Sequence, residues 1–204
     1  MTENLVQLFI NSVFTGNILL AYFLGMCSFI AVSKNLNTAV GLGFAVVFVL
    51  SVTTPLNWVI FHFLLAPGAL SWIGLPGVDL GFLKFITFIA VIAAVVQAIE
   101  ILIERFSAAL YAGLGVFLPL IAVNCAILGA SLFMVERNYT FMESLIYGFG
   151  SGVGWMMAIV TMAAIRIKLR YANPPYGLEG YGLTMIVTGL MAMAFMLFSG
   201  ISTG

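Results

Sequence analysis

Two cysteines are the residues of this sequence with the clearest capacity for chemistry. Cys27 and Cys125 are the only cysteines among 204 residues, they lie 98 residues apart, and each stands in a long apolar stretch. One soft side chain in each half of the chain predicts a site on an internal two-fold axis, where two thiolates would bind a soft metal. Two other interpretations stay open. Free cysteines commonly pack as small buried hydrophobic residues, and two cysteines can form a disulfide.

The number of available ligands limits what such a site could hold. An iron–sulfur cluster or a tetrahedral metal ion takes four protein ligands. The chain offers two cysteines and a single histidine, His62, which lies near a predicted membrane edge. If the cysteines bind metal, we therefore expect half a site that another subunit completes.

The composition decides which kind of protein positions these cysteines. Hydrophobic residues make up 63% of the chain, charged residues 7%, and the mean hydropathy is +1.20. Soluble domains carry about 25% charged residues, so the sequence predicts an integral membrane protein. The net charge of zero gives no reason to expect a nucleic-acid partner. The N-terminus lacks the basic region of a cleavable signal peptide, so we expect the first apolar segment to remain.

The charge-free stretches predict an all-α, polytopic membrane protein with six transmembrane helices in a single membrane domain, residues 1–204. A helix needs about 20 apolar residues to cross a bilayer, and no segment shows the apolar–polar alternation of a membrane barrel. The predicted helices are 5–33, 39–64, 81–104, 108–134, 142–168 and 181–201.

Two charge-free stretches, 4–33 and 106–135, are too long for a simple span. Thirty helical residues would measure about 45 Å, against a bilayer core of about 30 Å. These spans must tilt, overhang or break, and each is the first of three helices. We therefore predict a 3+3 inverted repeat with halves of about 1–104 and 105–204, in which helices 1 and 4 are broken near the cysteines. Residues that could break them are Gly16, Asn17, Gly25, Gly113, Gly115 and Pro119.

The basic residues predict the orientation. With six spans, five of the seven basic residues fall on the side opposite the termini. Cytoplasmic loops concentrate Lys and Arg, so both termini are expected in the periplasm. The five are Lys34, Arg105, Arg166, Lys168 and Arg170, and the two on the other side are Lys84 and Arg137.

Other residues have competing interpretations. Glu100 shares a helix face with Gln97 and Glu104 and is a candidate for an ion pathway, or it simply reaches the cytoplasmic interface beside Arg105. Asn124 and Gly25 are candidates for contacts around the metal ligands, and a buried Asn near a helix break can instead satisfy backbone groups. The glycines at 148, 150, 152 and 154 predict close helix packing rather than a phosphate loop.

Several segments resemble one known family. Residues 115–127 (GVFLPLIAVNCAI) and 23–27 (FLGMC) are similar to the cysteine motifs of the paired membrane subunits of Na⁺-translocating NADH:quinone reductase and the related Rnf complex, the NqrDE/RnfAE family. The resemblance extends through 147–155 (YGFGSGVGW), 164–166 and 189–191, and covers essentially the whole chain. The motifs GSGVGW and 135–139 (VERNY) resemble the quinone reductase more than Rnf.

The resemblance implies that Cys27 and Cys125 supply two ligands of an intramembrane [2Fe–2S] cluster, and that the D subunit, a partner of opposite topology, supplies the others. It implies a translocase of the bacterial inner membrane that also contains the A, B, C and F subunits. In it electrons from NADH pass through a flavin and this centre to quinone while Na⁺ is exported. This chain would bind no flavin or NAD and hold no complete active site. The alternatives are the A subunit of an Rnf complex, which transfers electrons between ferredoxin and NAD, a transporter with structural cysteines, and a passive assembly scaffold.

Overall fold

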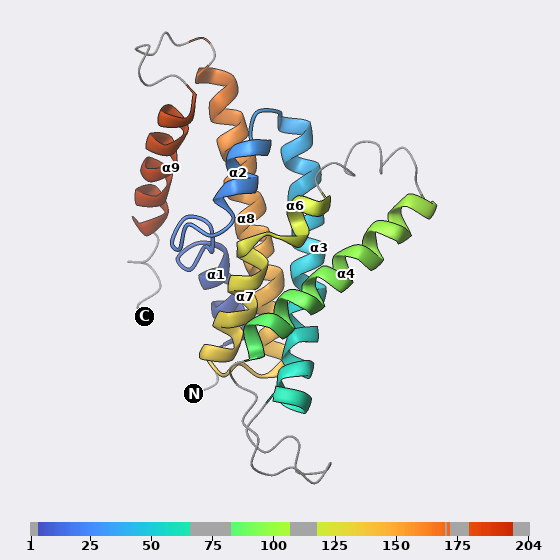
Figure 1. Cartoon of the computed structure of the whole chain (residues 1–204). Coiled ribbons are helices and arrows are strands. Elements are labelled where there is room, and N and C mark those ends of the chain that lie inside the picture. Colours follow the sequence, from blue (N-terminus) through green and yellow to red (C-terminus); the bar gives the residue numbers. More distant parts are fainter. Residues whose placement is uncertain (1–3, 66–82, 107–117, 170, 172–179, 198–204) are drawn as a thin grey trace.

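The computed structural model describes residues 4–65, 83–106, 118–169, 171 and 180–197. All regular elements in these ranges are helices (Figure 1), which confirms the predicted all-α class for this part of the chain. The elements are α1 (Leu5–Val13), α2 (Met26–Val32), α3 (Leu36–Ile60), the π-helical turn η1 (Phe61–Leu65), α4 (Lys84–Phe106), α6 (Leu118–Ala122), α7 (Cys125–Glu136), α8 (Phe141–Leu169) and α9 (Tyr181–Met196).

Four helical segments in this part of the chain are long and apolar enough to cross a membrane. They are Leu36–Leu65, Lys84–Leu102, Pro119–Glu136 and Phe141–Leu169, and the apolar helix Tyr181–Met196 is shorter. The predicted spans 39–64, 81–104 and 142–168 correspond to three of the four within a few residues. The candidate breakers Gly113 and Gly115 lie outside the described residues.

The long stretch 4–33 does not form one continuous helix. Helix α1 ends at Val13, α2 begins at Met26, and residues 14–25 lie between them as turns. Along the other long stretch, α6 ends at Ala122 and α7 begins at Cys125. Figure 1 shows α1 and α2 following one another along the bundle, while α6 and α7 run the opposite way. The six-span inverted repeat itself stays a prediction.

A buried asparagine holds the turns between α1 and α2. Asn17 is 1% exposed, and its side-chain nitrogen donates to the carbonyls of Val13 (3.0 Å) and Gly154 (2.8 Å). Its side-chain oxygen accepts from the backbone N–H groups of Leu19 (3.1 Å) and Leu20 (3.3 Å). Backbone groups without a helical partner must be satisfied inside a membrane protein, and Asn17 does this for the non-helical segment. Asn17 thus has the role that the sequence allows for a buried Asn near a helix break.

Helix α8 lies at the centre of the bundle and packs most extensively on α3 and α1. A Cβ added at Gly148 or Gly152 would lie 2.8 Å from backbone atoms of α3. At Gly150 and Gly154 it would lie 2.9 Å from Ser12 Cβ and 2.8 Å from the Val13 carbonyl oxygen, both on α1. The alternating glycines thus let two helices approach α8 closely on different faces, which confirms the close packing expected from the sequence.

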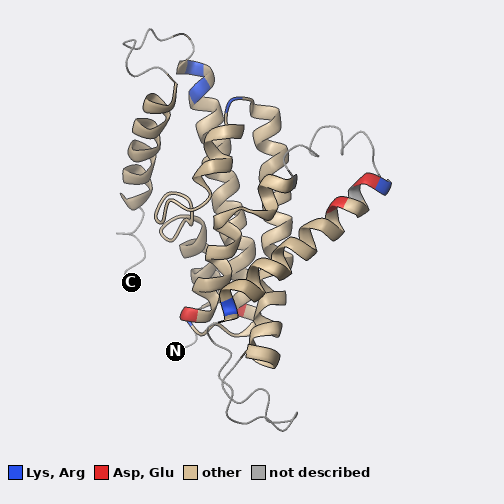
Figure 2. Ribbon diagram, in the orientation of Figure 1, with Lys and Arg blue, Asp and Glu red and all other residues tan. Residues whose placement is uncertain are grey.

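Among the described residues, Lys, Arg and Glu lie toward the ends of the helices, and the middle of the bundle contains none of them (Figure 2). Helix α4 leans away from the bundle toward its carboxyl end (Figure 1). Its apolar side chains stay uncovered: Ile86 is 67% exposed and Ile101 is 60% exposed. Such a face needs lipid or another protein around it, so the structure is that of a membrane protein with a large apolar surface on α4.

Candidate functional site

The two cysteines stand at the beginnings of two helices that run in opposite directions. Cys125 is the first residue of α7, and Cys27 is the second residue of α2. Figure 1 shows both helix starts at mid-height in the bundle, side by side. The amino end of a helix carries partial positive charge and unpaired N–H groups. Two such ends therefore meet where the sequence places its two cysteines.

A direct contact joins the two cysteine-bearing turns. The backbone N–H of Gly25, which precedes α2, donates to Cys125 Sγ at 2.9 Å. Gly25 is two residues before Cys27, so residues 100 positions apart in the chain are brought to hydrogen-bonding distance. Hydrogen bonds to a sulfur ligand tune the electronic properties of a metal site. The spatial pairing of the two cysteine segments, expected from their symmetric spacing, is thus present in the structure.

Asn124 and Ser28 connect the same two turns a second time. Asn124 caps α7 by accepting from the Ala126 N–H at 3.0 Å. Its nitrogen donates to Ser28 Oγ at 3.3 Å, and that hydroxyl donates to the Gly25 carbonyl at 3.0 Å. Asn124 is 2% exposed and Ser28 is 1% exposed. Asn124 therefore satisfies backbone and locks the two helix starts together, and the site includes Ser28, which no pattern in the sequence indicated.

Gly25 has a backbone conformation that suits only glycine at this place. Its φ is +84°, in the left-handed region, and a Cβ there would lie 2.6 Å from Trp155 Nε1 and 3.0 Å from Asn124 Oδ1. Trp155 is completely buried, and its indole nitrogen has no hydrogen-bond partner among the described residues. A buried indole nitrogen normally finds one. In the sequence, Trp155 of α8 stands out only as part of a family motif.

The carboxyl end of α2 is also held by a side chain. Arg166 Nη1, on α8, donates to the Ile30 carbonyl at 3.1 Å and to Ser33 Oγ at 2.7 Å. The carboxyl end of a helix carries partial negative charge and unpaired carbonyls, so the guanidinium stabilises this end of α2. The charge pattern of the sequence predicted only an orienting role for Arg166. The contact could not be predicted because it joins residues more than 130 positions apart.

The two thiols remain accessible from outside the chain. Both Cys27 and Cys125 are exposed and free, without a disulfide between them. Cys125 also lines a groove of about 580 Å³ between α7 and the start of α4, together with Leu24, Phe85 and Gly129. In the described part of the chain no three His, Cys, Asp or Glu residues come together as a metal cage. The donor set thus fits two thiolate ligands, half of what an iron–sulfur cluster takes.

Glu100 lies away from the cysteines, near the carboxyl end of α4. Its side chain is partly buried, whereas Gln97 and Glu104 on the same helix face are exposed. Glu104 and Arg105 follow it in the last turns of α4. The structure therefore places Glu100 slightly inward of a charged helix end and brings it to neither cysteine. Its role in an ion pathway stays a prediction.

In its described residues the chain is a helical membrane protein in which two exposed thiols stand at the beginnings of two helices, and one hydrogen-bond network joins these helix starts. The family model of the Rnf-Nqr subunit, membrane protein, matches residues 5–202. The chain therefore belongs to the Rnf-Nqr membrane subunit family, as its cysteine motifs indicate.

Three relatives among the similar curated proteins carry the name of the E subunit of Na(+)-translocating NADH-quinone reductase. The protein from Hahella chejuensis is 60% identical over 202 residues, covering 99% of this chain and 100% of the relative. The one from Marinobacter nauticus is 58% identical over 98% of this chain and 99% of the relative. The one from Psychromonas ingrahamii is 57% identical over 98% of each.

Proposed function

We propose that this chain is an electron-relay membrane subunit of a Na⁺-translocating NADH:quinone reductase, in the position of the E subunit, and that it holds half of an intramembrane [2Fe–2S] cluster. The observation that carries this proposal is the hydrogen bond from the Gly25 N–H to Cys125 Sγ, because it brings the two cysteine segments into one site. Family membership and the relatives' shared name support the same complex and favour it over an Rnf complex.

Cys27 and Cys125 would bind the cluster, and a second subunit would supply the other two ligands. Such a cluster carries one electron at a time between donors and acceptors. The protein contributes the preorganised position of the thiolates. The Asn124–Ser28–Gly25 network fixes both helix starts, and Arg166 anchors the distal end of α2. The exposure of both thiols leaves room for a partner's ligands, which we assign to the D subunit.

The opposite directions of α1–α2 and α6–α7 support a 3+3 inverted repeat around these thiols. The charges support an orientation with periplasmic termini in a bacterial inner membrane. Lys34, Arg166 and Lys168 would face the cytoplasm, and Arg137 would face the periplasm. The A, B, C and F subunits would complete the complex and bind its flavins and NADH, and Na⁺ is the transported ion.

The iron content and the spectrum of the purified complex test this proposal. The wild-type complex should show, after dithionite reduction, an EPR signal that is missing when both Cys27→Ala and Cys125→Ala are present. About two iron atoms per complex should be lost with it, as a [2Fe–2S] cluster contains two. Ser51→Ala is a matched control because, among the described residues, its hydroxyl donates to the Val47 carbonyl of its own helix (2.7 Å) and to no other group. Equal iron content and equal spectra in the double variant and the wild type would refute cluster binding.

We also propose that Glu100 contributes to Na⁺ handling. It is partly buried on a helix whose other charges lie at its ends. Carboxylates placed inside membrane segments are costly and mark ion pathways. Na⁺, like other hard cations, prefers oxygen ligands of this kind.

Replacing Glu100 with Gln should therefore raise the Na⁺ concentration needed for half-maximal stimulation of quinone reduction by about tenfold or more. Removing one charged contact costs about 1.5–3 kcal/mol, and 1.4 kcal/mol is a factor of ten. The measurement is NADH-driven turnover of the whole complex as a function of Na⁺. Glu104→Gln, on the same face but exposed, is the control and should leave the curve unchanged. Unchanged Na⁺ dependence and turnover in Glu100→Gln would exclude this role.

A further inference from the structure

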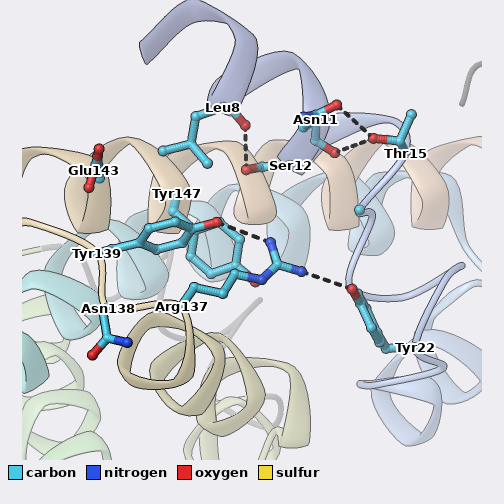
Figure 3. Close-up of a pocket in the computed structure, with 11 residues that line it drawn as sticks. Leu8, Asn11, Ser12, Thr15, Tyr22, Arg137, Asn138, Tyr139, Glu143 and Tyr147 are labelled. Atoms are coloured by element: carbon cyan, nitrogen blue, oxygen red, sulfur yellow. Dashed lines mark hydrogen bonds between the residues drawn. The ribbon is translucent and has the colours of Figure 1, made fainter. Parts of the chain in front are cut away.

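A cavity of about 780 Å³ lies apart from the cysteine site, between α1, the turns that follow α1, and the connection between α7 and α8 (Figure 3). The volume is in the range of sites that bind small molecules. The residues around it include Arg137, three tyrosines and Asn11, and none of them belongs to the proposed electron relay. A polar cavity lined by a cationic side chain is suited to an anionic ligand.

Arg137 is held on the cavity wall by two tyrosines from distant parts of the chain. Its Nη1 donates to the Tyr139 hydroxyl and its Nη2 to the Tyr22 hydroxyl, both at 3.0 Å. The guanidinium carbon lies 5.8 Å from the ring centre of Tyr147, which is 1% exposed and lines the cavity. Burial lowers the pKa of Arg137, but the hydrogen bond with Tyr139 and the charge interactions with all three tyrosines raise it, and the net direction is upward. The Arg137 guanidinium is therefore held in a defined position on the cavity wall.

Glu143 is the acidic residue in the cavity lining, and its carboxylate already accepts hydrogen bonds from Thr140. Glu143 Oε2 accepts from the Thr140 backbone N–H at 2.8 Å and from its hydroxyl at 3.0 Å, an arrangement that caps the start of α8. Figure 3 shows Glu143 on the other side of the tyrosine rings from Arg137. Within the described residues, three tyrosines interact with Arg137, and the ring centre of Phe133 lies 5.8 Å from its guanidinium carbon. Its positive charge is thus available to a ligand.

The cavity offers hydrogen-bond donors in excess. The Tyr22 and Tyr139 hydroxyls accept from Arg137, so each keeps its own O–H for another acceptor. Asn11 Oδ1 accepts from Thr15 Oγ1 at 2.9 Å, which leaves the Asn11 amide N–H groups as donors. A guanidinium with several neutral donors matches a ligand that is anionic and has only acceptor oxygens, and phosphate groups are bound in this way.

The position of the cavity indicates where such a phosphate would come from. Arg137 and Tyr139 lie between Pro119–Glu136 and Phe141–Leu169, two segments able to cross a membrane. The cavity is thus at the ends of these spans, at the depth of the lipid headgroups, where tyrosines are enriched. We propose that this cavity binds a phosphate group, and that an anionic phospholipid headgroup is its source.

Binding of a short-chain lipid to the delipidated complex that carries this chain tests the proposal. Dioctanoyl phosphatidylglycerol should raise the thermal midpoint of the complex in a saturable way. Arg137→Gln should weaken this binding by about tenfold or more, because a hydrogen bond to a charged group is lost. Arg105→Gln removes the same charge from the exposed end of α4 and should bind as the wild type does.

Inorganic phosphate in a parallel titration distinguishes the two sources. Saturable binding of phosphate at similar concentrations, also weakened by Arg137→Gln, would support the phosphate site and identify free phosphate as its ligand. If the complex with Arg137→Gln does not assemble, the same titrations are made with Tyr22→Phe, because this change removes one of the two hydroxyls that position the guanidinium. Absence of saturable binding of both probes to the wild type would overturn the proposal. The proposal would also be overturned if the wild type and the variant that assembles (Arg137→Gln or Tyr22→Phe) bound the lipid and phosphate with equal affinity.

Discussion

Replacing either Cys27 or Cys125 with Ala is expected to reduce NADH-driven quinone reduction by the complex to background while the complex still assembles. The proposed cluster would lose one of its four protein ligands, and among the described residues no group of three metal-ligating side chains could hold it instead. Assembly should persist because both cysteines are exposed and lie in first helical turns, where Ala is well tolerated. The measurements are quinone reduction by the purified complex and its subunit composition.

Two controls distinguish a loss of electron transfer from a loss of structure. Ser51→Ala, in α3, should retain wild-type turnover. NADH oxidation by a soluble artificial acceptor should be preserved in the cysteine variants, because in the proposed relay that reaction precedes the membrane site. Wild-type rates of quinone reduction in either cysteine variant would show that the thiols have no place in electron transfer.

Gly25→Ala is expected to destabilise the site and the whole chain by about 2–5 kcal/mol. The left-handed backbone costs a residue with a Cβ about 1–2 kcal/mol, and overpacking a tight interior costs about 1–3 kcal/mol. The new Cβ would lie 2.6 Å from Trp155 Nε1 and 3.0 Å from Asn124 Oδ1. Trp155 is completely buried, so the start of α2 has to shift instead. The shift would break the contact between the Gly25 N–H and Cys125 Sγ.

Thermal unfolding of the complex and the EPR signal of its reduced form measure this effect. Gly180→Ala is the control for backbone strain alone, because Gly180 also has a positive φ (+88°) but nothing lies within 4 Å of an added Cβ. Gly189→Ala is the control for added volume in open space inside a helix. We expect Gly25→Ala to lower the thermal midpoint more than either control and to change the EPR signal. An unaltered midpoint and signal would show that the site tolerates a Cβ there.

Much of the architecture could be predicted because membrane proteins have strict compositional requirements. A chain with so few charges has to place its apolar helices in lipid, so the class and three of the spans followed from charge-free stretches. The ends of the helices were less predictable: one predicted helix begins at 39, whereas α3 begins at Leu36. The predicted end of the last helix, at 201, lies outside the described residues. The glycine pattern of α8 was predictable because small residues in apolar helices serve close packing.

The excess length of 4–33 indicated that this segment could not be a simple span, but it did not indicate how the extra length is accommodated. A helix can tilt, overhang or break, and these cost similar energies in a bilayer. The structure has turns at 14–25, held by Asn17 through a bond to Gly154 on a distant helix. That contact depends on how α8 packs against α1, which no local pattern in residues 4–33 specifies.

The sequence by itself determined the membrane class, the two candidate thiols and the family, because hydropathy and motif identity are properties of residues read in order. Only the tertiary structure decided how the two cysteine-bearing turns are joined, through Gly25, Ser28 and Asn124. It also decided that Arg137 is the cation that lines the cavity of about 780 Å³. The physical reason is distance along the chain. These contacts join residues about 100 positions apart, and they form only when helix packing has fixed both partners.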